Sequence, residues 1–149
     1  MKETPQTLWQ NAMSFAFAID KIARDEDDAT VGRYSAAAHL LSGFALELVG
    51  KAFLLHVEDP TRSRHDLIQL YERVTAHGLD VPADIRVAVE ALAPSHKDLA
   101  FRYMPPGYKT TVPDLGVFAP SLVSFVREMA IVMAGEERQV VSWLWADRT

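Results

Sequence analysis

The segment from residue 30 to residue 57 most constrains the fold, because its apolar residues do not keep to one face. The residues that repeat at helical spacing are Leu41, Phe44, Leu48, Ala52 and Leu55. Leu46, Val49 and Phe53 cover other faces of the same helix. A helix that is apolar nearly all round is buried among its neighbours. The segment therefore predicts the central helix of an all-α protein.

Two glycines in this segment, Gly43 and Gly50, lie one heptad apart on nearly the same face. Glycine weakens a helix by roughly 1 kcal/mol relative to alanine, so both positions predict the close approach of a neighbouring helix. The segment is also apolar on more faces than the other helices of a five-helix monomer cover easily, which favours a homodimer.

Four other segments predict helices, over about 5–24, 64–76, 82–92 and 120–147. Ser63 is the expected N-cap of the third helix. Pro94 is expected to end the fourth helix, and the last helix is expected to begin near Pro120. The stretch 100–119 has no helical period and predicts a long packed loop. Short connections then predict one domain over residues 1–149, an up-and-down bundle of about five helices.

Composition excludes several classes of protein. The chain has no cysteine, which excludes disulfides and thiolate sites and fits a reducing compartment. The formal net charge is −5, so a globally basic nucleic-acid-binding surface is absent. No run of eighteen apolar residues occurs, and we expect a cytoplasmic protein without a membrane span.

Motifs for common chemistries are absent from the sequence. It contains no GxGxxG, Walker, HExxH or GxSxG pattern. No two of its five histidines lie three or four residues apart, so no metal pair on one helix is expected, and no cofactor.

Three polar groups remain as candidates for a site. Glu47 and Lys51 form an i,i+4 pair, which is either a surface ion pair or part of a pocket lined by the central helix. His65 and Asp66 open the third helix, where Asp66 is either a cap or part of an anion site. Basic residues around the long loop form either a solvated surface or a small basic patch: Arg62, Arg64, His96, Lys97 and Arg102.

Two of these segments carry a family resemblance. Residues 44–55 read FALELVGKAFLL and contain E-x3-K-A-x-L-L, and residues 65–70 read HDLIQL and contain HDL-x2-L. Together with Phe101-Arg102-Tyr103 they resemble the HEPN superfamily, the higher-eukaryote and prokaryote nucleotide-binding domains. The similarity extends over roughly residues 30–110.

The resemblance implies a helical bundle that forms homodimers with a cleft between subunits. It also implies a role in nucleotide binding, in RNA cleavage by toxin–antitoxin or CRISPR systems, or in partnership with a small nucleotidyltransferase. Ribonuclease members carry Arg-x4–6-His, typically in the last helix. Here only Arg33 and His39 have that spacing, and they lie in the second helix. They are weak catalytic candidates, in which His39 would act as a base and Arg33 would stabilise the phosphorane.

The sequence thus predicts a non-catalytic HEPN-like module that binds a nucleotide, a nucleic acid or a partner protein. An RNA-cleaving toxin and a purely structural homodimer are the alternatives. The expected ligand site combines Glu47 and Lys51, His65 and Asp66, and the pair Arg102 and Tyr103, which would supply a phosphate contact and a stacking face.

Overall fold

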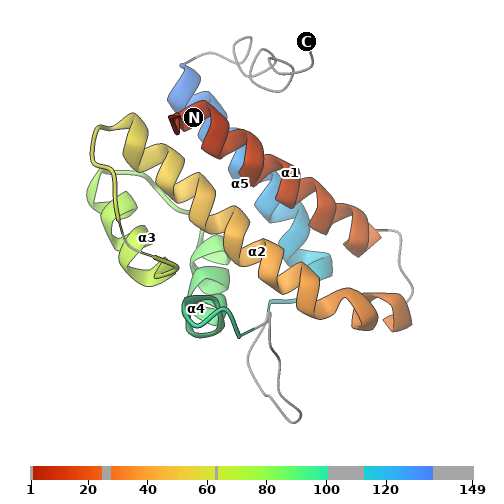
Figure 1. Cartoon of the computed structure of the whole chain (residues 1–149). Coiled ribbons are helices and arrows are strands. Elements are labelled where there is room, and N and C mark those ends of the chain that lie inside the picture. Colours follow the sequence, from red (N-terminus) through yellow and green to blue (C-terminus); the bar gives the residue numbers. More distant parts are fainter. Residues whose placement is uncertain (1, 25–27, 63, 101–112, 136–149) are drawn as a thin grey trace.

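The protein is a bundle of five α-helices (Figure 1). The computed structural model describes residues 2–24, 28–62, 64–100 and 113–135. The helices are α1 (Pro5–Arg24), α2 (Asp28–His56), α3 (Leu67–Ala76), α4 (Ala83–Lys97) and α5 (Leu115–Ala134). The described part of the chain contains no β-strand, so the predicted all-α bundle is confirmed.

Helix α2 is the centre of the bundle, as its apolar pattern predicts. It contacts each of the other four helices. Helix α1 runs antiparallel to α2 and packs against both α2 and α5, while α3 and α4 lie on the opposite side of α2 from α1 (Figure 1). This arrangement explains why Ala38, Ala45, Leu46, Val49 and Leu54 are all fully buried on a single helix.

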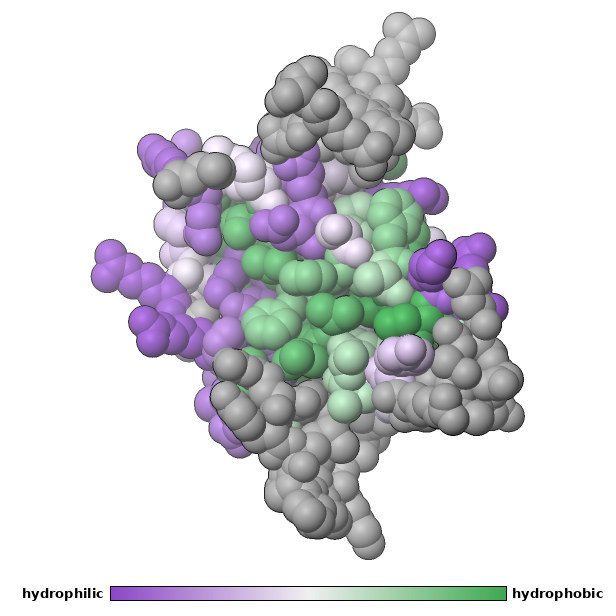
Figure 2. Space-filling model, turned by 45° about the vertical axis from the view of Figure 1, so that its right-hand side comes forward, coloured by the Kyte–Doolittle hydropathy of each residue, from purple (hydrophilic) through white to green (hydrophobic). Residues whose placement is uncertain are grey.

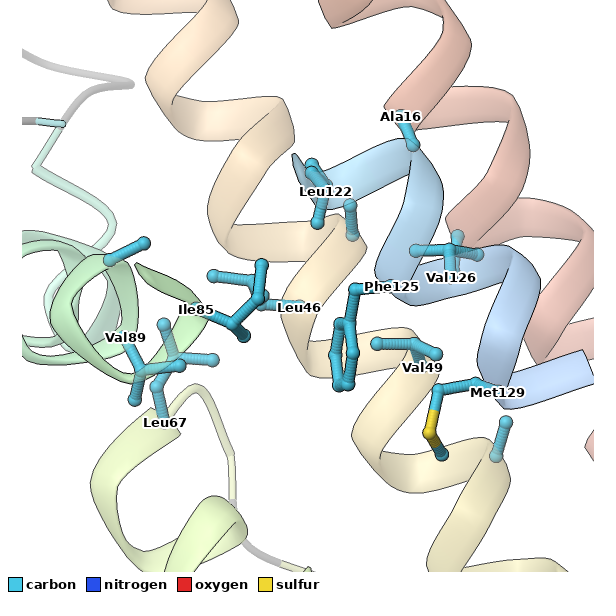
Figure 3. Close-up of a cluster of buried hydrophobic side chains, with 14 of the residues drawn as sticks. Ala16, Leu46, Val49, Leu67, Ile85, Val89, Leu122, Phe125, Val126 and Met129 are labelled. Atoms are coloured by element: carbon cyan, nitrogen blue, oxygen red, sulfur yellow. The ribbon is translucent and has the colours of Figure 1, made fainter. Parts of the chain in front are cut away.

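The core lies where α2, α4 and α5 meet (Figure 3). Leu46 of α2, Ile85 of α4 and Phe125 of α5 point toward one another there. Two buried polar groups at its edges are satisfied by backbone carbonyls. The Trp9 indole donates to the Val126 carbonyl over 2.6 Å, and the Tyr71 hydroxyl donates to the Leu46 carbonyl over 2.9 Å. Each bond ties two helices together without leaving an unpaired group in the core.

Helix α3 begins later than the sequence predicts. Its N-cap is Asp66, whose carboxylate accepts a 3.0 Å hydrogen bond from the Gln69 N–H. The capping interpretation of Asp66 is therefore confirmed, and the expected start at Ser63 and Arg64 is wrong. Asp66 caps the helix in place of Ser63 because its short side chain brings the carboxylate within reach of the free N–H groups of the first turn.

The two prolines expected at helix ends lie inside helices instead. Helix α4 continues through Pro94 to Lys97, and α5 begins at Leu115 rather than at Pro120. Asp114 caps α5 by accepting from the Gly116 N–H over 2.9 Å. An internal proline removes one helical hydrogen bond, and the packing of the residues beyond it offsets that cost.

Helix α5 ends at Ala134 and does not reach residue 147 as predicted. Gly135 is its C-cap, with φ of 78° in the left-handed region that glycine adopts readily. Residues 136–147 of the predicted last helix lie outside those described. Residues 101–112 of the expected long loop also lie outside those described. Residues 115–119, which were expected in the same loop, are helical and belong to α5.

Two helices are long and apolar enough to cross a membrane by length and composition alone. They are Tyr34–His56, with a mean hydropathy of 1.4, and Leu115–Ala134, with a mean hydropathy of 1.6. About 67% of the first and 50% of the second are buried inside the bundle. Central helices of a helical bundle have the same properties, so this is weak evidence for a membrane span.

Candidate functional site

Glu47 is a buried carboxylate on α2 that receives hydrogen bonds from three side chains. Glu47 as a whole is 5% exposed. Lys51, one turn further along α2, pairs with Oε1. His65, just before α3, and His96, on α4, both contact Oε2, over 2.9 Å and 2.6 Å. The cluster of Glu47, Lys51, His65 and His96 therefore joins three parts of the chain, and we call it the Glu47 cluster.

The two imidazoles in the Glu47 cluster act as hydrogen-bond donors. An ionised carboxylate only accepts, so His65 donates from Nδ1 and His96 from Nε2. Lys51 occupies the other oxygen. The carboxylate is thus divided: one oxygen faces the Lys51 cation, and the other faces the two imidazole nitrogens.

These contacts keep Glu47 ionised despite its burial. Burial raises the pKa of its carboxyl, but hydrogen bonds from His96, Lys51 and His65, together with the charge of Lys51, outweigh that effect. The pKa of Glu47 is lowered to about 2. A buried carboxylate without such partners would be expected to take up a proton instead.

His96 reaches the cluster because residue 43 is a glycine. A Cβ at position 43 would lie 2.3 Å from the His96 Nδ1 atom. Gly50 plays a similar part on α2, since a Cβ there would lie 2.9 Å from Leu70 of α3. The predicted close approach at both glycines is therefore confirmed, and the neighbours are helices α4 and α3 of the same chain.

His65 reaches the cluster through an unusual backbone conformation. Its φ is 58°, in the left-handed region, immediately before the Asp66 cap. Only a few per cent of non-glycine residues adopt positive φ, so the surrounding structure must hold His65 in place. The cap that starts α3 and the histidine that joins α2 thus belong to one turn.

Phe44 covers the two imidazoles from the apolar side. Its ring centroid is 5.8 Å from that of His65 and 5.1 Å from that of His96, and both contacts are edge-to-face. The two imidazoles meet each other edge-to-face at 5.4 Å. His96 is 2% exposed, whereas the side chain of His65 is 30% exposed and that of Lys51 is 26% exposed. The cluster is closed from the core and open at its His65 and Lys51 edge.

The structure brings together Glu47, Lys51 and His65, as the sequence predicts, with Asp66 next to them. Asp66 contacts Lys97 of α4 over 3.3 Å. Arg102 and Tyr103 lie outside the described residues. The sequence predicted His96 only as part of a surface patch, because Pro94 predicted the end of the fourth helix. Extending the helix through Pro94 would have placed His96 on it.

His39, the weak catalytic candidate, lies in the interior of the bundle. It is 3% exposed, and burial lowers the pKa of its imidazole. A base must touch the proton that it removes, so this placement does not suit RNA cleavage by the single chain. The side chain of Arg33 lies outside the described part of the structure.

A second histidine–carboxylate group lies at the far end of α3. Asp59 pairs with Arg73, and His77 contacts its other oxygen over 2.8 Å. Hydrogen bonds from His77 and Arg73 lower the pKa of the Asp59 carboxyl. All three side chains are about one-third exposed, so the group is a surface tie between the α2–α3 connection and α3.

Two hollows open beside α3 and α4. One, of about 380 Å³, is lined by Ile68, Tyr71, Glu72, Thr75, Val81, Arg86, Val89 and Glu90. The other, of about 450 Å³, is lined by Asp66, Ile68, Gln69, Glu72, Ala93, Pro94 and Lys97. The second hollow reaches Asp66 and Lys97 at the edge of the Glu47 cluster, while Glu47 itself lines neither. A ligand at this edge would therefore meet Lys97 before the buried carboxylate.

Comparisons with protein-family models, with curated proteins and with solved structures find no match to this chain.

Proposed function

We propose that the protein is a non-catalytic, HEPN-like helical module that binds the phosphate of a nucleotide or of RNA. The proposed site is the open edge of the Glu47 cluster. The observation that carries it is the gathering of three cationic or imidazole groups from separate elements: Lys51 of α2, His65 before α3 and Lys97 of α4. Their exposed fractions rise from the cluster outward, which makes them accessible to an anion.

The chain around this edge adds further positive charge. Arg62 and Arg64 are exposed in the segment that leads into His65. The N-terminus of α3 lies in the same turn, and free N–H groups at a helix start favour anions. The hollow of about 450 Å³ beside Asp66 and Lys97 offers room for part of a ligand. Because Lys51 and Lys97 already pair with carboxylates, we expect weak binding of mononucleotides and tighter binding of RNA.

The proposal includes a cytoplasmic homodimer, with or without a small nucleotidyltransferase as partner. Absence of cysteine supports a reducing compartment. Partly buried apolar side chains on α1 and α2 support a second copy, among them Phe15, Leu41 and Leu48. The two glycines of α2 do not add to this argument, because α3 and α4 of the same chain occupy the space beside them.

The competing account is that the Glu47 cluster only ties α3 and α4 to α2. The two accounts differ in the behaviour of Lys51→Ala. A binding site should lose affinity for a fluorescent nucleotide or a labelled short RNA at a temperature where the variant is still folded, whatever stability is lost with the Glu47 pair. A purely structural tie should lose stability and leave any binding unchanged.

The titration should use nucleotide at millimolar and RNA at micromolar concentration, with Lys21→Ala on α1 as the matched control. We expect affinity to fall in Lys51→Ala and in Lys97→Ala and to persist in Lys21→Ala. Absence of binding by the wild type at these concentrations would refute the proposal. Incubation with total RNA tests the ribonuclease alternative, and cleavage abolished in both Arg33→Ala and His39→Ala would establish it.

A further inference from the structure

We infer that Glu47, His65 and His96 bind a divalent transition-metal ion, with Zn²⁺ the best fit. Each residue offers one ligand atom, and these three atoms lie within 4.8 Å of one another. They come from α2, from the turn before α3 and from α4, so only the folded chain brings them together. The ion would share His65 with the proposed phosphate site, but zinc binding does not require phosphate.

The distances in the Glu47 cluster suit a metal after a small expansion. His65 Nδ1 and His96 Nε2 lie 2.9 Å and 2.6 Å from the same oxygen of Glu47. Ligand atoms around tetrahedral zinc lie about 3.3 Å apart, as bond lengths of about 2.0–2.1 Å require. The three ligands therefore need to separate by about half an ångström, which side-chain rotation provides.

The ligand types favour zinc over the hard cations. Two imidazole nitrogens and one carboxylate oxygen are the donors of many three-residue zinc sites, in which water or substrate takes the fourth position. Ca²⁺ and Mg²⁺ prefer six or more oxygen ligands, and Glu47 supplies only one inward-facing oxygen. We therefore expect zinc or cobalt to bind and magnesium or calcium not to.

The structure holds two of the three ligands before any metal binds. Gly43 leaves the space that the His96 ring fills, and the positive φ of His65 aims its ring at the same oxygen. Lys51 stays on Glu47 Oε1, where its ion pair fixes the orientation of the carboxylate whose other oxygen binds the metal. The exposed edge at His65 gives the ion a path of entry and leaves the fourth position open to water.

Metal binding requires both ligand nitrogens to give up the protons that they donate to Glu47. In the metal-free cluster His65 carries its proton on Nδ1 and His96 on Nε2, where each donates to Glu47. With the metal bound, these nitrogens give their lone pairs to the ion and the protons move to the opposite ring nitrogens. The nearby Lys51 charge opposes a dication, so we expect micromolar rather than nanomolar affinity.

The test is titration calorimetry of ZnCl₂ into EDTA-treated, re-dialysed protein at neutral pH, together with thermal melts. We expect one ion per chain, a rise in the melting temperature, and a visible Co²⁺ spectrum with the intensity of a tetrahedral site. His65→Ala and His96→Gln should each weaken binding by about tenfold or more. His65 is partly exposed, so His65→Ala is expected to keep its helical circular dichroism spectrum and to report on the metal even if His96→Gln unfolds.

The matched control is His77→Ala, which removes the exposed histidine–carboxylate pair at the other end of α3. Its zinc affinity should equal that of the wild type. The inference fails if zinc does not bind at submillimolar concentration, or if folded His65→Ala binds it as tightly as the wild type. It fails equally if His77→Ala abolishes binding, because the ion would then lie at the surface pair.

Discussion

At the scale of single residues, Gly43 has a role that alanine cannot fill. A methyl group there would lie 2.3 Å from His96 Nδ1, so the ring would have to leave its bond to Glu47. We expect Gly43→Ala to lower the free energy of unfolding by about 1–3 kcal/mol, despite the better helix propensity of alanine. Urea denaturation measures the difference.

The control for that substitution is Gly50→Ala. There the nearest atom is the terminal Cδ2 of Leu70, which can move by a rotamer change. Its unfolding free energy should stay within about 1 kcal/mol of the wild-type value. An equal loss in both variants would mean that crowding on α2, and not the fit of His96, determines the result.

Glu47 predicts an acid-dependent loss of stability in the metal-free protein. Its pKa is lowered from an ordinary 4.5 to about 2 in the folded state. A lowered pKa stabilises the folded chain above the unfolded pKa, and this contribution disappears as the pH falls from about 4.5 toward 2. Its full size is about 3 kcal/mol. Glu47→Gln should be less stable at neutral pH and should show a flatter stability profile over that range in EDTA.

The exposed Glu72→Gln variant on α3 is the control, because its stability profile should follow that of the wild type. If Glu47→Gln keeps the full acid dependence, another carboxylate must be its source.

Sequence alone found three of the four residues of the Glu47 cluster and missed His96 for a physical reason. The i,i+4 spacing of Glu47 and Lys51 fixes their contact within one helix, and Asp66 before an apolar run predicts a cap. The contact between Glu47 and His96 spans 49 residues and depends on how α4 crosses α2. The periodicity of apolar residues along one helix does not predict how that helix crosses another.

At the scale of helices, capping side chains mark the helix termini, whereas the prolines that predicted termini do not. Asp66 and Asp114 each accept a backbone N–H at the start of their helix, and Gly135 ends α5 in the left-handed conformation. Pro94 and Pro120 looked like boundaries but lie within α4 and α5. The burial of the residues beyond each proline favours continuing the helix, a tertiary effect that sequence propensity does not include.

Pro94→Ala tests this balance in α4. Alanine restores the N–H that Pro94 lacks, which can bond to the Glu90 carbonyl one turn earlier. The substitution also makes the unfolded chain more flexible, which lowers the net stabilisation. We expect a net stabilisation of about 1–2 kcal/mol, measured by thermal or urea unfolding. Destabilisation would instead show that a bend at Pro94 is needed to place His96.

Pro82→Ala at the N-cap of α4 is the control, because that position donates no helical hydrogen bond. Its stability should change by less than about 1 kcal/mol, and in the destabilising direction.

At the scale of the whole molecule, the described helices present an apolar surface. Figure 2 shows a hydrophobic patch on one face, bordered by hydrophilic side chains. Partly buried apolar side chains on α1 and α2 include Phe15, Ile22, Leu40, Leu41 and Leu48. Phe15 of α1 meets Phe44 of α2 with ring centroids 6.4 Å apart, so the two helices form one continuous surface there. Contiguous apolar surfaces of this kind commonly mark interfaces.

We expect this surface to join two copies of the chain. Sedimentation at tens of micromolar should give a mass of about twice the 16.6 kDa of one chain. Leu41→Glu places a charge on the shared surface of α1 and α2, so we expect it to give monomers that keep the helical circular dichroism spectrum. Val87→Glu is the matched control, because Val87 is a 64% exposed residue of α4, away from α1. It should sediment as the wild type does. A wild-type protein that stays monomeric would contradict the prediction, and dimers that persist in Leu41→Glu would place the interface on another face of the bundle.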